Sequence, residues 1–134
     1  GEMAFSSNKL TSLTMPNSVT SIGELAFSSN ELTSLTMPNS VTYIGNDAFS
    51  DNKLTSLTIP NGVSHIGGSA FFRNQLTSLT MSNNVTYIGN GAFSQQTSSN
   101  GTVYGPSGYV KNTYDTNSGN QFDKVHLPNY VVTP

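Results

Sequence analysis

The strongest constraint on the fold of this chain is a 22-residue period that runs through most of its sequence. Residues 8–29 and 30–51 agree at 17 of 22 positions. An alanine followed by a phenylalanine recurs once per period, at Ala4-Phe5, Ala26-Phe27, Ala48-Phe49, Ala70-Phe71 and Ala92-Phe93. A repeat this regular predicts a solenoid, because a single repeat has too few apolar side chains to bury a core and must stack on its neighbours.

Each repeat begins with a short segment of strand character. In the first copy, residues 10–15 end in alternating apolar and hydroxyl residues, which places Leu13 and Met15 on the core face of a strand. Pro16 ends this strand, since proline cannot donate to a sheet. The equivalent segments, 32–37, 54–59 and 76–81, are expected to pair with it in parallel.

The second half of the repeat turns the chain twice. Residues 19–22 form another short extended segment, and Gly23 then supplies a position where φ can be positive. A brief turn or a single helical turn follows at Ala26-Phe27. The repeat also carries one asparagine per coil, expected to form a ladder that satisfies backbone groups, at Asn8, Asn30, Asn52 and Asn74.

The pattern Asn-x-x-Leu-x-x-Leu-x-Met-Pro-x-x-Val-x-x-Ile-Gly-x-x-Ala-Phe, over residues 1–94, resembles the BspA-type (treponemal-type) leucine-rich repeat of bacterial and some protozoan surface proteins. It departs from the family in carrying Asn where many members have Cys. The resemblance implies a β-rich (α/β) leucine-rich-repeat solenoid with a parallel sheet of short strands. It also implies a secreted or cell-surface location and a role in adhesion or protein binding.

One domain is expected, in which residues 1–94 form a solenoid of about four coils and residues 95–134 a C-terminal capping segment. In the cap, a strand at 102–105 keeps Val103 in the column of Met81. A short helix over 109–116 and a last strand with Phe122, Val125 and Leu127 follow, similar to the terminal segment of the same family. Such a cap would cover the apolar end of the last coil.

The N-terminal end of the solenoid has no comparable cap, because the chain opens in the middle of a repeat. We therefore expect a truncated first coil, with any signal peptide lying upstream. Leu10, Leu13 and Met15 would face an exposed edge. Self-association through this uncapped edge, or a preceding repeat, would cover it.

Composition excludes several classes of function. Charged residues are only 9% and the net charge is −2, without a basic cluster, which argues against nucleic acid as a partner. There is no cysteine and no apolar run long enough to span a membrane. His65 and His126 are the only histidines, and no pair of carboxylates has catalytic or metal-ligand spacing. We predict a protein that is not an enzyme and uses no metal or cofactor.

Three sets of residues are candidates for binding. The first comprises the outward hydroxyl rows, which leucine-rich repeats expose on their concave side: Ser34, Thr36, Ser56, Thr58, Ser78 and Thr80. These rows could dock a protein, hold a repetitive ligand such as a glycan or ice, or simply solvate a strand face. The second is a column of Tyr43, His65 and Tyr87, which suits either cross-coil stacking or contact with a sugar or protein. The third is Phe72-Arg73, whose residue types are common at binding hot spots.

The sequence thus predicts a non-enzymatic module for adhesion or binding at the cell surface. Its partner would be an extracellular or host protein or a glycan. The alternative is a structural spacer or stalk without a ligand of its own, which the near-identity of the coils favours.

Overall fold

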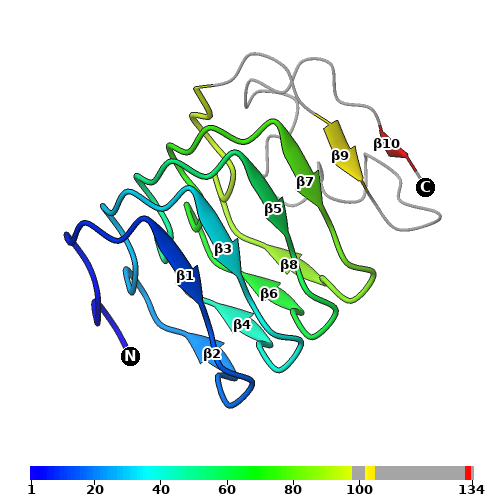
Figure 1. Ribbon diagram of the computed structural model, residues 1–134. Coiled ribbons are helices and arrows are strands. Elements are labelled where there is room, and N and C mark those ends of the chain that lie inside the picture. The colour runs from blue at the N-terminus through cyan, green and yellow to red at the C-terminus, as the bar shows by residue number, and fades with distance from the viewer. Residues whose placement is uncertain (98–101, 105–131, 134) are drawn as a thin grey trace.

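The computed structural model describes residues 1–97, 102–104 and 132–133, and the chain winds through stacked coils that each contribute two short strands (Figure 1). The three-residue strands are β1 (Ser12–Thr14), β3 (Ser34–Thr36), β5 (Ser56–Thr58), β7 (Ser78–Thr80) and β9 (Thr102–Tyr104). The two-residue strands are β2 (Ser21–Ile22), β4 (Tyr43–Ile44), β6 (His65–Ile66), β8 (Tyr87–Ile88) and β10 (Val132–Thr133).

The strands form two parallel arrays on different sides of the coil (Figure 1). On one side, which we call the first face, β1 pairs with β3, and β5, β7, β9 and β10 form a four-stranded sheet. On the other, the second face, β2, β4, β6 and β8 form a continuous sheet. Every strand pair is parallel, and in coils one to four equivalent residues pair. The predicted parallel β-solenoid is confirmed, with strands shorter than the sequence indicated.

The first face is interrupted between its second and third strands. The amide of Met15 donates to the carbonyl oxygen of Thr36 at 3.2 Å, and that of Ile59 donates to Thr80 at 2.9 Å. No corresponding bond joins Met37 to Thr58 in the described part of the chain, and β3 and β5 form no ladder. The uniform parallel pairing predicted for this face is therefore wrong at one of its junctions.

A stack of phenylalanine rings runs through the interior. Phe5, Phe27, Phe49, Phe71 and Phe93 follow one another with centroids 5.3 to 5.4 Å apart and nearly parallel planes. Phe49 and Phe71 are fully buried among the leucine, isoleucine and valine columns of the repeat. Burial of such side chains stabilises by roughly 1.5–3 kcal/mol each, so the stacked coils form one continuous core.

The predicted asparagine ladder is confirmed for Asn30, Asn52 and Asn74, whereas Asn8 is exposed and donates within its own turn to Ser6. Asn52 accepts a hydrogen bond from the amide of Leu32 through Oδ1 at 3.0 Å. Its Nδ2 donates to the carbonyl oxygens of Phe27 at 3.0 Å and Phe49 at 3.2 Å. The buried amide thus closes its own turn and joins it to the preceding coil, which satisfies backbone groups that water cannot reach.

Gln96 extends this ladder by one position that the sequence analysis missed. Its Oε1 accepts from the amide of Leu76 at 3.0 Å, and its Nε2 donates to Phe71 at 2.9 Å. The signal was present, because Gln96 lies one period after Asn74 and its side chain ends in the same carboxamide.

The glycine that follows the second strand serves a different purpose from the one predicted. Gly91 is the only described glycine with positive φ, so the expected role of Gly23 is wrong. A Cβ on Gly67 would instead lie 2.6 Å from the backbone carbon of Gly45 in the preceding coil. Glycine is required there because neighbouring backbones approach too closely for any side chain.

Positive φ is found instead at the two bends of the next turn. Residues with φ between 51° and 55° occupy them in successive coils, namely Leu25, Ser29, Asp47, Asp51, Ser69 and Arg73. The predicted turn around Ala26-Phe27 is confirmed as a hydrogen-bonded turn, in which Ser28 donates to the carbonyl oxygen of Leu25 at 3.1 Å. No helix is present in the described residues.

The strand predicted at 102–105 is confirmed as β9, but its register differs from the prediction. Val103 pairs with Leu79 and not with Met81, because the connection into β9 is two residues longer than the repeat. The predicted helix over 109–116 and the last strand around Phe122, Val125 and Leu127 lie outside the described residues. The boundary at residue 94 and the capping role of residues 95–134 remain predictions.

Candidate functional site

The hydroxyl rows lie on the outer side of the first face. In β3, β5 and β7 the central leucine points inward and the flanking serine and threonine point outward, as the period of two requires. Ser56 pairs with Ser78 and Thr58 with Thr80, so equivalent hydroxyl groups follow one another across neighbouring strands. The structure therefore places the predicted rows together on one surface.

A groove of about 490 Å³ crosses these rows where β3 and β5 part. Its polar lining comprises Ser34, Thr36, Asn39, Ser56, Thr58, Asn61, Thr80 and Ser82. Its apolar lining comprises Leu35, Met37, Ile59, Pro60 and Met81. Of the six predicted hydroxyl residues, only Ser78 is absent from this lining. The volume falls in the range of about 300–1,000 Å³ that is usual for ligand pockets.

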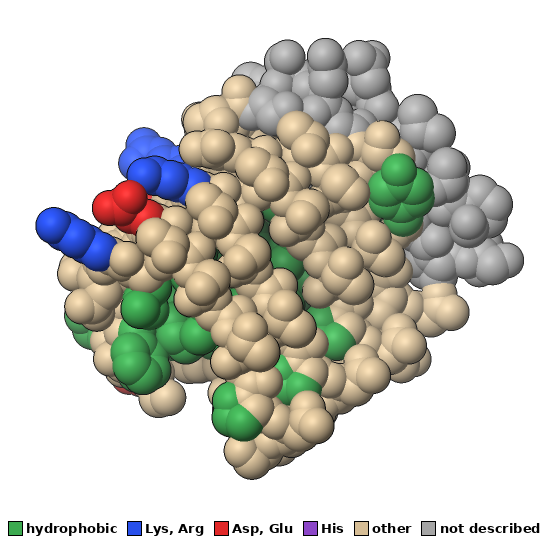
Figure 2. Space-filling model, viewed as in Figure 1, with side chains coloured by type: hydrophobic (Ala, Val, Ile, Leu, Met, Phe, Trp, Pro, Cys, Tyr) green, Lys and Arg blue, Asp and Glu red, His purple; other side chains and the backbone are tan. Residues whose placement is uncertain are grey.

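Among the described residues, no charged side chain lines the groove. Figure 2 shows the same surface covered by uncharged polar side chains, with lysine, arginine and carboxylate groups gathered at one edge. A ligand that fits here would be held by hydroxyl and amide hydrogen bonds over an apolar floor. Such a site favours neutral polar ligands over ions.

Two asparagines at the rim were not predicted as part of a site. Asn39 accepts a hydrogen bond from the amide of Asn61 through Oδ1 at 3.2 Å, which links the turns that follow β3 and β5. The coils thus remain joined at this turn although their strands separate. Asn39 and Asn61 line the groove only because β3 and β5 lie apart. The repeat pattern does not predict that separation.

The aromatic column lies on the second face. Rings of Tyr43 and His65 stack with centroids 4.7 Å apart, and His65 and Tyr87 with centroids 4.3 Å apart. Both tyrosines remain more than 40% exposed. Burial lowers the pKa of His65 below its ordinary value, because the ring is partly removed from water. Since both faces of His65 are covered by tyrosine, the column offers mainly ring edges and phenol groups to a ligand.

Phe72 and Arg73 lie in a turn, apart from both rows of strands. The guanidinium of Arg73 sits 5.0 Å from the ring centroid of Phe72 and 3.7 Å from a carboxylate oxygen of Asp51. Nearby in the coil stack, Lys53 donates to Glu31 at 2.8 Å, and this hydrogen bond lowers the pKa of Glu31. Such exposed pairs contribute little to stability, because water and salt screen them. The charged groups of this edge are engaged with one another.

The candidate residues therefore occupy three separate surfaces. The hydroxyl rows lie on the first face, the aromatic column on the second face, and Phe72-Arg73 in a turn. Over the part of the chain that the structure describes, no cluster of histidine and carboxylate side chains could hold a metal ion. The same residues include no helix long and apolar enough to cross a membrane.

Stacked coils, two arrays of parallel strands and a buried asparagine ladder define a leucine-rich-repeat solenoid, a class of repeat scaffold. The sequence matches the family described as BspA type leucine rich repeat region, in six copies over residues 1–115, and the chain belongs to this family. The match extends beyond the residue 94 at which the visible pattern ends. No curated relative and no solved structure matched the chain. The family is a repeat scaffold that commonly mediates protein interaction, and its members are typically surface or secreted proteins.

Proposed function

We propose that this protein is a non-enzymatic binding module of the cell surface, which recognises a protein or glycan partner through its first face. The observation that carries the proposal is the uncharged groove across the hydroxyl rows. Membership of a family that commonly mediates protein interaction supports it.

The chemistry of the groove suits a neutral, hydrogen-bonding ligand. Serine and threonine hydroxyls both donate and accept, and the amides of Asn39 and Asn61 add further donors and acceptors. The half-buried Leu35 in the apolar floor would lose further contact with water when a ligand binds, which would add affinity. Extended polar peptides and sugar chains share these requirements.

The test is a binding screen of the full chain against extracellular-matrix proteins and a glycan array. A Thr36→Lys, Thr58→Lys variant places two charges in the groove and should lower affinity at least tenfold. The matched control is Thr20→Lys, Thr42→Lys, which adds the same charge at exposed threonines outside the groove. Loss of binding in the control as well would contradict the groove as the site.

A second arm replaces the aromatic column, as Tyr43→Ser, His65→Ser, Tyr87→Ser. If this variant alone loses binding while circular dichroism shows an intact fold, the second face is the site and the groove is not. Selective loss in a Phe72→Ser, Arg73→Ser variant would assign the function to that turn.

A structural spacer is the second candidate, and the close identity of the coils favours it. Residues 8–29 and 30–51 differ at only five of 22 positions, whereas binding faces normally carry varied anchor residues. Absence of any ligand for the unmodified chain in both screens would favour the spacer over the binding module.

A further inference from the structure

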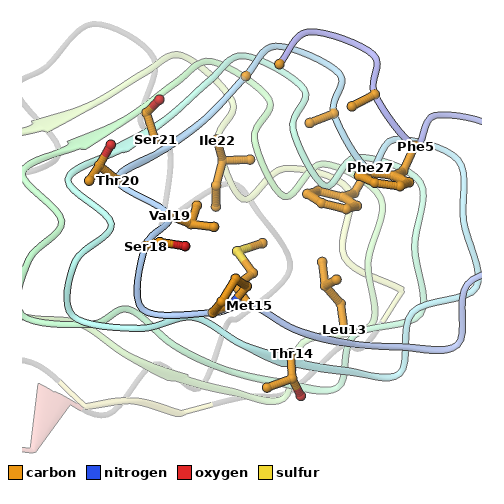
Figure 3. A pocket seen from close by; sticks show the side chains of 15 residues that line it. Phe5, Leu13, Thr14, Met15, Ser18, Val19, Thr20, Ser21, Ile22 and Phe27 are labelled. Atoms are coloured by element: carbon orange, nitrogen blue, oxygen red, sulfur yellow. The ribbon is translucent and has the colours of Figure 1, made fainter.

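The strand β9 continues the first face beyond β7 and changes the side chain that this face presents to solvent (Figure 1). In β1, β3, β5 and β7 the third residue is a threonine. Figure 3 shows the first of these, Thr14, directed away from the interior of its coil. In β9 the residue that pairs with Thr80 is Tyr104. The row of threonines on the first face therefore gives way to a tyrosine at β9.

The backbone holds Tyr104 with its ring on the outer side of the sheet. The amide of Thr102 donates to the carbonyl oxygen of Thr77 at 2.8 Å, and that of Met81 donates to Tyr104 at 2.8 Å. Val103, between Thr102 and Tyr104, is fully buried. Because side chains alternate along a strand, Tyr104 faces outward, and it is 44% exposed. Its ring is thus open to a ligand on this face.

Tyr104 is the direct neighbour of a residue that lines the groove on the first face. Thr80 belongs to the lining of that groove and pairs with Tyr104 across the sheet. Neighbouring strands lie about 4.8 Å apart, which is comparable to the length of one sugar ring. A ligand in the groove therefore needs to extend by only one strand to reach the tyrosine.

Tyr104 also introduces variation on an otherwise uniform face. The 22-residue period assigns Thr102 to the position after Thr80, so the sequence analysis missed Tyr104 as a member of the row. The longer connection into β9 places Tyr104 there instead. Tyrosine is enriched at binding hot spots, whereas serine and threonine are under-represented. The first face thus has an anchor residue of the kind that its repeated strands lack.

We propose that Tyr104 anchors a neutral sugar chain, which runs across the strands of the first face from the groove over Thr80 to the tyrosine ring. This inference rests on the proposed function, because it names the class of ligand that the same face binds. A sugar ring has a face of C–H groups and an edge of hydroxyl groups. The C–H face packs on the aromatic ring, and the hydroxyl groups bond to the serine, threonine and asparagine side chains of the groove.

The absence of charge favours a neutral sugar over a peptide. Among the described residues, none that lines the groove and none in β1, β3, β5, β7 or β9 is charged. A charged peptide side chain that loses water here would gain no ionic partner, which is costly. The same cost applies to the carboxylate or sulfate groups of acidic sugars. Hydroxyl groups of a neutral sugar both donate and accept, as those of serine and threonine do.

A fluorescence titration of the full chain tests the anchor, because the chain contains no tryptophan. Tyr104→Trp places a single indole at the proposed contact, and Tyr87→Trp places one at an equally exposed site, 44%, on the second face. The probes are neutral cello-, malto- and fully acetylated chito-oligosaccharides, with an oligogalacturonate as the charged control. At least one neutral probe should give a saturable change in the emission of Tyr104→Trp and none in that of Tyr87→Trp. Equal changes in both variants, or a response to the oligogalacturonate alone, would overturn the proposal.

Calorimetric titration of the best neutral probe separates a contact from an effect on folding. Tyr104→Ser should raise its dissociation constant about tenfold, as expected for a hot-spot residue. Tyr104→Phe keeps the ring and should stay within about twofold of the unmodified chain. Tyr87→Ser is the matched control and should also leave affinity unchanged. Equal losses in Tyr104→Ser and Tyr104→Phe, with circular dichroism showing an intact fold, would overturn stacking on the ring.

The outcomes distinguish this inference from the proposed function on which it rests. Sugar binding that Thr36→Lys, Thr58→Lys abolishes and Tyr104→Ser leaves intact would overturn the role of Tyr104 and retain the groove. A protein ligand that is lost in the same lysine variant, without binding of any glycan, would overturn the sugar and retain the binding module. Absence of every ligand for the unmodified chain would overturn both.

Discussion

The two faces of this solenoid are built from the same repeats, yet one is a continuous sheet and the other is interrupted. On the second face, β2, β4, β6 and β8 pair without a break, and Tyr43, His65 and Tyr87 stack along its outer side. On the first face, β3 and β5 separate, and a groove opens between outward rows of serine and threonine.

The two faces differ in the side chains that cover the outer sides of their strands. Stacked rings contribute roughly 0.2–1 kcal/mol per cross-strand pair and add to the ladder that they cover. The small hydroxyl side chains of the first face are the same on the paired strands β1 and β3 and on β5 and β7, so they permit the separation of β3 and β5 but do not cause it. Two substitutions, hydrogen exchange and a pH dependence test this difference between the two faces, and the largest expected effect comes first.

Gly67→Ala should cause the largest loss of unfolding free energy, because it separates coils at the second face. The new methyl group would meet the backbone of Gly45 and Asn46 at 2.6 Å, so the coils must move apart. We expect a loss of about 3 kcal/mol, at the upper end for overpacking. Urea denaturation measures it, with Gly68→Ala as the control, because its nearest neighbour would be 3.3 Å away. An equal effect of both substitutions would contradict a requirement for close approach.

Asn52→Ala should lower the unfolding free energy, because Asn52 joins two coils just before β5. It removes the acceptor of the buried Leu32 amide and two donors to carbonyl oxygens of Phe27 and Phe49. The expected loss is about 2 kcal/mol, the usual cost of leaving a buried group unsatisfied. The control is Asn17→Ala in an exposed turn, which should change unfolding free energy by less than about 0.5 kcal/mol. A similar loss in both would show that the ladder contributes little.

Hydrogen exchange tests the interruption without any mutation. The amide of Ile59 is bonded to Thr80 across an intact junction, whereas that of Met37 has no partner across the gap. Met37 should exchange at least tenfold faster than Ile59, although both side chains are buried, because local opening is not needed for its exchange. Equal protection would mean that β3 and β5 pair in solution.

The smallest effect is a pH dependence that belongs to the second face alone. Burial lowers the pKa of His65 in the folded state, so the unfolded chain takes up its proton first as pH falls. Stability should be full above the ordinary histidine pKa of 6.5 and should decline as pH falls below it toward the lowered value. Thermal unfolding at several pH values measures this decline, which His65→Gln should reduce. A decline of the same size in the variant would assign it to other groups.

Much of the fold followed from the period alone. The columns of leucine, isoleucine, alanine and phenylalanine fixed which side chains are buried, and Asn52 and its equivalents were correctly predicted as a ladder. The serine and threonine rows and the aromatic column were also placed on the outer sides of their strands, because side chains alternate along a strand, whereas their role in binding stays a prediction.

Other features depended on contacts between coils. Gly23 was assigned to backbone freedom, but the role of its equivalent Gly67 is set by the backbone of the coil before it. Val103 was placed in the column of Met81, but it pairs with Leu79. The sequence does not show that the connection into β9 is two residues longer than the repeat. Asn39 and Asn61 belong to the groove only because two strands separate.

The sequence by itself determined the repeating unit and its inner and outer sides, because these depend on the order of residues within 22 positions. Only the contacts between coils settled where neighbouring coils touch and where they part. The repeats carry nearly the same local information, so a difference such as the separation of β3 and β5 depends also on the coils on which each repeat packs.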